Sequence, residues 1–389
     1  MRRAIGRQSD RGVCEVTALS SIKDIAGAGR IVVKIGSALL VKDGAPNREF
    51  LGSLVDDLVR LRAGGTQIIL VSSGAIALGA ARLDLPQGGR ASLADAQAAA
   101  SVGQVALAQL WADALGAHDL IAAQMLVTLG DLEDRRRYLN AAATLERLVA
   151  NGAVPVVNEN DSVATEEIRF GDNDRLAARV AQAACADAVL LLSDVDGLYD
   201  RPPHEAGAQL IARVEGVSEE TLAMATGASS SGMGSGGMLA KVQAAQIAER
   251  AGIALAIING MNPHPITAAL NASRGTVFVP VRRDNARKNW LAGRIAPEGT
   301  LTIDAGCRDA LATGASLLAA GLIGVEGDFQ RGALVRVCGP DGDGLAQGLV
   351  EYSARECRAI AGLKHSQQHA KLGYAPRAAV VHRDHMVRV

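Results

Sequence analysis

The stretch RIVVKIGSALLVKDGAPNREFLGSLVDDLVRLRAGGTQIILVSSG, residues 30–74, holds two short apolar runs separated by a longer amphipathic one. The outer runs, 30–41 and 66–74, are rich in Val, Ile and Leu, which is typical of buried strands. Two glycines at 64 and 65 end a helical pattern between them, whose apolar residues are Leu51, Leu54, Val55, Leu58 and Leu61. A helix that joins two buried strands predicts a parallel strand pair, and therefore an α/β fold.

The same alternation continues along the chain. Further short apolar runs, separated by helix-like stretches, occupy residues 120–128, 153–161, 188–197 and 253–260. Parallel strands need crossover helices of this kind. The sequence therefore predicts a doubly wound, mainly parallel α/β domain over residues 30–284.

The chain after residue 298 has a different character. Short strand-like runs lie between Gly, Asp and Pro turns, at residues 300–306, 322–327, 333–339, 344–353 and 378–387. They predict a small β-rich, barrel-like domain over 299–377, which a linker at 285–298 joins to the first domain. We interpret residues 1–29 as a flexible N-terminal extension and residues 378–389 as a C-terminal strand or tail.

Composition and charge narrow the class of protein. Lys and Arg number 40 and Asp and Glu number 41, so the net charge of −1 provides no strong field for nucleic acid or a membrane surface. No apolar run approaches the about 18 residues that a membrane helix needs. The five cysteines form no Cys-x-x-Cys pair, and we expect reduced thiols in a cytoplasmic protein.

Two segments indicate an anion-binding edge at the carboxyl ends of the predicted strands, where open parallel sheets bind their ligands. Lys34 lies inside an apolar strand that breaks at Gly36. A buried ammonium group is costly unless it meets an anion. The segment VSSGAIALG, residues 71–79, leads from a strand into a helix, whose first N–H groups suit a carboxylate or a phosphate.

Polar residues gather at a third place. The segment NEND, residues 158–161, ends a predicted strand, and GDND, residues 171–174, precedes a predicted helix. The second segment is also a good helix cap, and that interpretation stays open. Two polar clusters at one sheet edge offer many donors and acceptors, which favours a site for a small polar substrate.

The segment SSGMGSGGMLAK, residues 230–241, contains the letters G-x-G-x-x-G from Gly232 to Gly237. It follows a polar loop rather than a strand, so it does not predict a dinucleotide site, and G-x-x-x-x-G-K-[ST] is absent from the chain. A Gly-rich loop that opens a helix brings its N–H groups close to phosphates. With Lys241 one turn into that helix and Lys34 across the sheet edge, the pattern favours phosphoryl transfer.

Five segments in this order resemble the amino acid kinase family: VVKIGSALL (32–40), VSSGAIALG (71–79), VNENDSVATEEIRFGDND (157–174), LLLSDVDGLYD (190–200) and SGMGSGGMLAKVQAA (231–245). The segment GASLLAAGLIGVEGDFQRGALVRV, residues 314–337, resembles a PUA domain. The resemblance implies an amino acid kinase fold followed by a PUA domain. It also implies ATP-dependent phosphorylation of the γ-carboxylate of L-glutamate to L-glutamyl 5-phosphate, the first step of proline biosynthesis.

The resemblance implies roles for single residues as well. Lys34 and Lys241 would hold the ATP phosphates, and Asp174 would align the two lysines. L-Glutamate would be bound by Ser73, Asp161 and Asn173. ATP, with its Mg²⁺, would also contact Ser193, Asp194, Ser235, Gly236, Gly237, Met238, Leu239 and Ala240. No metal ligand of the protein itself is implied, whereas feedback inhibition by proline and a homo-oligomer are.

Two other functions stay open. One is a different kinase of the same family, which acts on acetylglutamate, aspartate, carbamate or a nucleotide monophosphate. The other is an RNA-binding protein, because PUA domains occur in RNA-modifying enzymes. Base stacking needs aromatic side chains, and the C-terminal segment has only Phe329, Tyr352 and Tyr374. We therefore expect no nucleic-acid partner.

Overall fold

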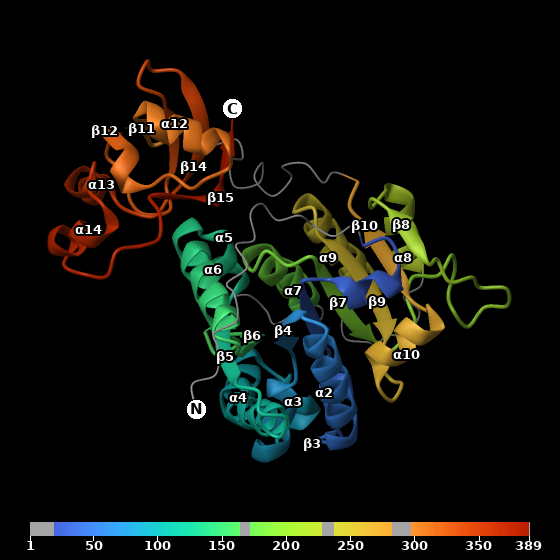
Figure 1. Ribbon diagram of the computed structural model, residues 1–389. Helices are drawn as coiled ribbons and strands as arrows, with labels where there is room; N and C mark the ends of the chain where they lie inside the picture. Colours follow the sequence, from blue (N-terminus) through green and yellow to red (C-terminus); the bar gives the residue numbers. More distant parts are fainter. Residues whose placement is uncertain (1–18, 164–171, 228–236, 282–296, 389) are drawn as a thin grey trace, which may run out of the picture. The chain divides into compact units, whose positions relative to one another are not determined.

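The computed structural model of the chain describes residues 19–163, 172–227, 237–281 and 297–388 (Figure 1). Contacts divide the chain into two compact units, with the division between residues 286 and 287. The first unit combines a large sheet with helices, and the second is a smaller, β-rich unit. Within the described ranges, no helix has both the length and the apolar character needed to span a membrane.

An eight-stranded sheet forms the centre of the first unit. Its strands are β1 (Arg30–Ile35), β4 (Gln67–Ser72), β5 (Ala122–Val127), β6 (Val154–Glu159), β7 (Ala188–Ser193), β8 (Arg213–Glu215), β9 (Ala254–Asn259) and β10 (Thr276–Val279). The order across the sheet is β5-β6-β4-β1-β7-β9-β10-β8. Every neighbouring pair is parallel except β9 and β10. The predicted doubly wound, mainly parallel sheet is therefore confirmed.

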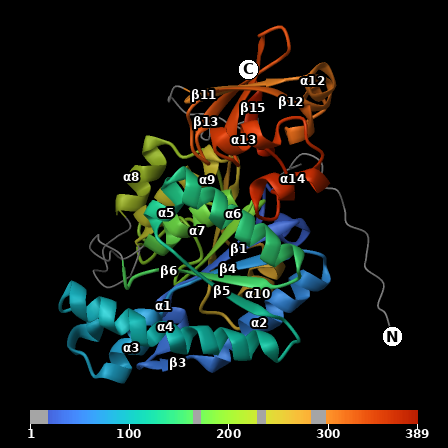
Figure 2. The ribbon, with the colours of Figure 1, turned by 90° about the vertical axis from the view of Figure 1, so that its left-hand side faces the viewer.

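Helices cover both faces of this sheet (Figures 1 and 2). One face carries α6 (Arg135–Ala150), α7 (Asp172–Ala183) and α9 (Met238–Arg250), with α5 (Leu129–Glu133) and α8 (Glu219–Gly227) beside them. The opposite face carries α2 (Arg48–Ala63), α4 (Leu93–Gly116) and α10 (Pro265–Ala272). The remaining elements are α1 (Ser37–Leu40), the hairpin of β2 (Val41–Lys42) and β3 (Ala45–Pro46), α3 (Ala75–Leu83) and η2 (Pro86–Gly89).

The helix predicted between the first two strands is α2. Its N-cap Asn47 accepts a hydrogen bond from the Phe50 backbone N–H at 3.3 Å, which satisfies one of the free donors of the first turn. Its predicted apolar stripe is buried against the sheet. Each such leucine contributes on the order of 1.5–3 kcal/mol when it is fully buried. The chain leaves the helix at Gly65, whose φ of +94° suits glycine.

The N-terminal part of the first unit differs from the flexible extension expected over residues 1–29. Residues 1–18 lie outside the described part of the chain, but a 3₁₀ helix, η1 (Ile22–Gly27), follows them. Leu19, Ile22 and Ile25 are buried in the same core as the sheet, and η1 packs on α10. The three apolar residues repeat every third position, which is the period of a 3₁₀ helix, but the pattern is too short to predict a packed element. The packing of η1 on α10 shows that this segment belongs to the core.

The second unit holds a five-stranded sheet in the order β12-β11-β13-β14-β15. Its strands are β11 (Gly299–Ile303), β12 (Leu322–Gly327), β13 (Leu334–Cys338), β14 (Gly344–Val350) and β15 (Val381–Arg388). Short helices join them: α12 (Ala305–Ala312), η3 (Ala319–Gly321), α13 (Ala354–Ile360) and α14 (His365–Leu372). Because β15 pairs with β14, the C-terminal strand is part of this sheet.

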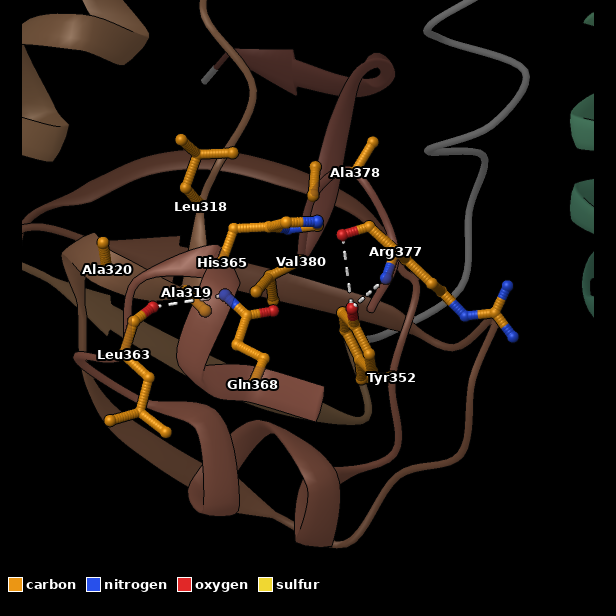
Figure 3. A pocket seen from close by; sticks show the side chains of 11 residues that line it. Leu318, Ala319, Ala320, Tyr352, Leu363, His365, Gln368, Arg377, Ala378 and Val380 are labelled. Carbon is orange, nitrogen blue, oxygen red and sulfur yellow. Dashed lines mark hydrogen bonds between the residues drawn. The ribbon is translucent and has the colours of Figure 1, made fainter. Parts of the chain in front are cut away.

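A cavity of about 180 Å³ lies in the second unit (Figure 3). Its wall includes Tyr352, whose hydroxyl accepts a hydrogen bond from the Arg377 backbone N–H at 2.6 Å, and Gln368, whose amide donates to the Leu363 carbonyl at 3.2 Å. Most small-molecule sites measure roughly 300–1,000 Å³. The cavity is smaller, and its lining contains none of the residues predicted to bind substrate or ATP.

Candidate active site

The carboxyl ends of β1, β4, β6 and β7 meet at one edge of the sheet in the first unit. In the β1 register, Lys34 lies opposite Val71 of β4 and Leu191 of β7. The residues at or just after the ends of these strands therefore lie along the same edge of the sheet: Lys34, Ser73, Asn158 and Ser193. As the sequence predicts, the polar and basic residues come together where a parallel sheet binds its ligands.

Two buried lysines meet one buried aspartate at this edge. Asp174, in the first turn of α7, is 0% exposed. Its Oδ1 lies 2.6 Å from Lys34 Nζ, and its Oδ2 lies 3.0 Å from Lys241 Nζ. Lys34 comes from β1 and Lys241 from α9, and they are 5% and 6% exposed. The helix α7 thus bridges the sheet and α9 through a single carboxylate.

The electrostatics of this cluster follow from its composition. Burial raises the pKa of Asp174, but the charges and hydrogen bonds of both lysines outweigh it, and its pKa lies below the ordinary value. Burial lowers the pKa of Lys34, and the like charge of Lys241 adds to that effect, while Asp174 opposes it. Two ammonium groups and one carboxylate leave one positive charge in excess, which suits an anionic ligand.

A chain of side-chain amides runs beside the lysine cluster. Asn173, next to Asp174, donates from Nδ2 to Ser73 Oγ at 2.6 Å and to Asn158 Oδ1 at 3.2 Å. Asn158 is 2% exposed and in turn donates from Nδ2 to Gln104 Oε1 at 2.8 Å. The Oδ1 of Asn173 is buried and has no hydrogen-bond partner within the described part of the chain. A buried acceptor is therefore available on the residue that precedes Asp174.

The other predicted site residues are placed as follows. Asp161 is half-buried and lies two residues after the end of β6. Burial lowers the pKa of Arg90, and the negative charge of Asp161 partly offsets that effect. Ser193 is buried at the end of β7 and donates to Asp194 Oδ1 at 3.1 Å. The charge of Asp194 also acts on Lys34. These residues therefore lie along the same edge as the lysine cluster.

The predicted phosphate loop is described only in part. Gly237 is exposed at the N-cap position of α9, and the first turn of that helix contains Met238, Leu239 and Ala240. Ser235 and Gly236, like most of the Gly-rich loop, lie outside the described residues. The N-terminal end of α9 carries the positive end of the helix dipole, and Lys241 adds a charge within its first turn.

The model of the amino acid kinase family matches residues 29–259, which is more than half of the chain. The chain belongs to the amino acid kinase family. The model of the PUA domain matches residues 299–372, in the second unit. The resemblance drawn from the sequence motifs is confirmed for both parts.

Similar members of the amino acid kinase family cover nearly the whole chain. A glutamate 5-kinase of Novosphingobium aromaticivorans is 61% identical over 96% of this chain and 99% of its own. A glutamate 5-kinase of Sphingopyxis alaskensis is 60% identical over 93% of this chain and 98% of its own. A glutamate 5-kinase of Zymomonas mobilis is 54% identical over 92% of this chain and 91% of its own.

Sequence reasoning missed two features of this amino acid kinase site. Gln104 contacts the amide chain from the middle of α4, where an alanine-rich helix gives no signal of a site. The second feature is Asp196, in the loop after β7. It accepts hydrogen bonds from Arg274 Nε at 2.8 Å and Asn259 Nδ2 at 3.1 Å, which ties that loop to the end of β9.

Proposed function

We propose that the chain is a glutamate 5-kinase, which transfers the γ-phosphoryl group of ATP to the γ-carboxylate of L-glutamate. The product is L-glutamyl 5-phosphate, formed in the first step of proline biosynthesis. The observation that carries the proposal is the buried cluster of Lys34, Asp174 and Lys241 at the sheet edge that also holds the hydrogen-bonded side chains of Asn173 and Ser73. The names of the three relatives support glutamate over acetylglutamate, aspartate or carbamate as the acceptor.

The chemistry needs charge neutralisation more than proton transfer. A glutamate carboxylate is ionised at neutral pH, so its oxygen attacks the γ-phosphorus without a general base. The obstacle is the approach of two anions, and the transition state spreads negative charge over the phosphoryl oxygens. Lys34 and Lys241 supply fixed positive charges at that point. Asp174 stays ionised between them and orients both ammonium groups.

The site fits ATP carrying its own Mg²⁺. Two buried lysines suit phosphate oxygens, and the described residues contain no group of three His, Cys, Asp or Glu side chains placed to hold a metal. Mg²⁺ commonly binds through substrate phosphates and keeps several waters. The ion neutralises phosphate charge when it is bound. On the protein side, Ser193, Asp194 and the segment from Ser235 to Lys241 contact the nucleotide.

Glutamate occupies the pocket formed by Ser73, Asp161 and Asn173. The chain turns at Gly74, whose φ is +116°, directly into the N-terminus of α3. The N–H groups of that first turn suit a carboxylate. In this proposal, the polar segments 158–161 and 171–174 bind the substrate and do not serve only as helix caps.

We also propose the domain bounds and the regulation that the family resemblance implies. Residues 30–284 form the kinase domain, on whose core η1 packs, residues 285–298 form the linker, and residues 299–377 form the PUA domain, whose sheet β15 completes. Proline acts as a feedback inhibitor, and the enzyme is a homo-oligomer.

An acceptor panel tests the activity. Purified protein is incubated with Mg²⁺-ATP and with glutamate, acetylglutamate, aspartate or carbamate, and ADP release is measured. We expect release that depends on glutamate. Preference for another acceptor would reassign the substrate. RNA affinity in filter binding without any acceptor-dependent ADP release would instead indicate an RNA-binding protein.

Asp161→Ala and Asn173→Ala are expected to raise KM for glutamate much more than KM for ATP. Both side chains belong to the proposed amino-acid pocket, and loss of a hydrogen bond to a charged group costs about 1.5–3 kcal/mol, or roughly 10–150-fold. Steady-state kinetics with each substrate varied in turn measure the two constants. Asn151→Ala, at an exposed helix end, is the control. Equal changes in both KM values would contradict the assignment.

A chain truncated after Arg294 is expected to fold and to keep kcat within about tenfold, a change below ~1.4 kcal/mol in the barrier. The second unit has its own core, and every proposed site residue precedes residue 242. Kinetics and circular dichroism of the truncated and full-length chains, at equal concentration, check the expectation. A folded but inactive truncated chain would show that the PUA domain helps to build the active site.

A further inference from the structure

The helix α4 packs closely against the start of α3 and the end of β4. Gly103 lies so near the start of α3 that a Cβ atom there would come within 1.7 Å of the Ala75 carbonyl oxygen. Trp111, two turns further along α4, donates from Nε1 to Ser72 Oγ at 2.8 Å. These two contacts hold α4 against the start of α3 and the last residue of β4. Figure 2 shows α3 and α4 packed together.

Gln104 is adjacent to Gly103, and its side chain reaches the end of β6. Its Oε1 accepts the hydrogen bond from Asn158 Nδ2 at 2.8 Å. An amide group has an oxygen that only accepts and a nitrogen that only donates. Because Gln104 binds the side-chain nitrogen of Asn158, the Asn158 oxygen faces Asn173. Asn158 Oδ1 accepts a hydrogen bond from Asn173 Nδ2 at 3.2 Å.

This order of hydrogen bonds determines which polar atom of Asn173 is left for a ligand. Its nitrogen donates twice, to Asn158 and to Ser73, so its oxygen is left as a buried acceptor. A buried acceptor without a donor is costly, and a bound ligand can relieve that cost. Of the polar groups of glutamate at neutral pH, the two carboxylates only accept and the α-ammonium group only donates.

We propose that Gln104 is a positioning residue, which orients Asn158 and Asn173 so that the Asn173 oxygen accepts a hydrogen bond from the α-ammonium group of glutamate. The inference rests on the proposed function. Gln104 acts only through Asn158 and contacts neither ATP nor the lysine cluster in the described contacts. Loss of the Gln104 side chain should therefore weaken the binding of glutamate and leave the binding of ATP unchanged.

Two substitutions test the orientation. Gln104→Met keeps the length of the side chain and removes the acceptor, so KM for glutamate is expected to rise about tenfold, the scale of one hydrogen bond to a charged group. Gln104→Glu keeps an acceptor and removes the donor, so KM is expected to stay within about threefold of the original, well below that scale. KM for ATP and kcat should be unchanged in both variants. The melting temperature should fall only in Gln104→Met, because the buried Asn158 amide nitrogen loses its acceptor there.

The matched control is Gln109→Met, on the exposed side of the same helix, where Gln109 bonds only to Asp113 in the described contacts. This control substitution should leave KM for glutamate, KM for ATP and kcat unchanged. The proposal is overturned if Gln104→Met keeps the original KM for glutamate, if both Gln104 variants raise it equally, or if KM for ATP rises in parallel. Failure of the original chain to release ADP with glutamate would instead refute the proposed function.

Discussion

Lys34→Ala and Lys241→Ala are each expected to lower kcat by about 10²–10³-fold, the scale for loss of one preorganised donor of positive charge. Both ammonium groups lie within 3.0 Å of Asp174, at the carboxyl ends of the strands. The fold should persist, because either variant leaves Asp174 paired with the remaining lysine. Steady-state kinetics at saturating ATP and glutamate measure kcat, and circular dichroism checks the fold.

Lys42→Ala is the matched control for these two variants. Lys42 is an exposed lysine of the short β2 strand, so its removal should leave kcat unchanged. A kcat within threefold of the original for either Lys34→Ala or Lys241→Ala would refute a role in phosphoryl transfer. The lysines would then serve only to pair Asp174.

Asp174→Asn is expected to produce the largest loss of stability, about 3–5 kcal/mol in the free energy of unfolding, as for other buried ion pairs that lose one partner. Asn keeps the shape of the side chain but removes the carboxylate that pairs with both buried ammonium groups. Urea unfolding of the variant and of the original chain measures the difference. Asp56→Asn is the control, because the Asp56 side chain is 45% exposed.

The pH dependence of that difference gives a second check. The pKa of Asp174 in the folded chain lies below its ordinary value of 3.8. Its ionised form therefore stabilises the fold fully above that value, and the contribution is lost as pH falls through the folded pKa. The stability gap between Asp174→Asn and the original chain should stay constant from neutral pH to about 5 and shrink only in stronger acid. A gap that disappears near neutral pH would mean that Asp174 is not held ionised by the lysines.

Local pattern was a good guide where burial repeats along the chain. The apolar runs that became β1 and β4 are buried on both faces of a parallel sheet, so four of the six residues in each strand are apolar and they are nearly consecutive. The predicted stripe of α2 is likewise buried. Pattern failed for the short helices α12, α13 and α14 of the second unit, because seven or eight residues hold too few turns for a periodic signal.

The candidate site divides in the same way. Polar residues directly after a strand of a parallel sheet must lie at one edge, so the sequence by itself brought Lys34, Ser73 and Asp161 to the same region. It also placed Asp174 at the start of a helix, where the residue types are compatible both with a helix cap and with a functional role. Which of the two holds depends on contacts between segments far apart in the chain.

Fold class, six of the eight strands of the large sheet (β1, β4, β5, β6, β7 and β9) and the sheet edge that carries the candidate site were determined by the sequence, because each follows from residues within one element or its immediate neighbours. The short strands β8 and β10 were not predicted. The tertiary structure shows that a single carboxylate, Asp174, joins lysines from β1 and α9, which the residue pattern left open and only the family resemblance implied. The tertiary structure alone brought Gln104 of α4 to Asn158 of β6. The physical reason is that hydrogen bonds and ion pairs act over about 3 Å, and such distances are set by how closely helices and sheet pack.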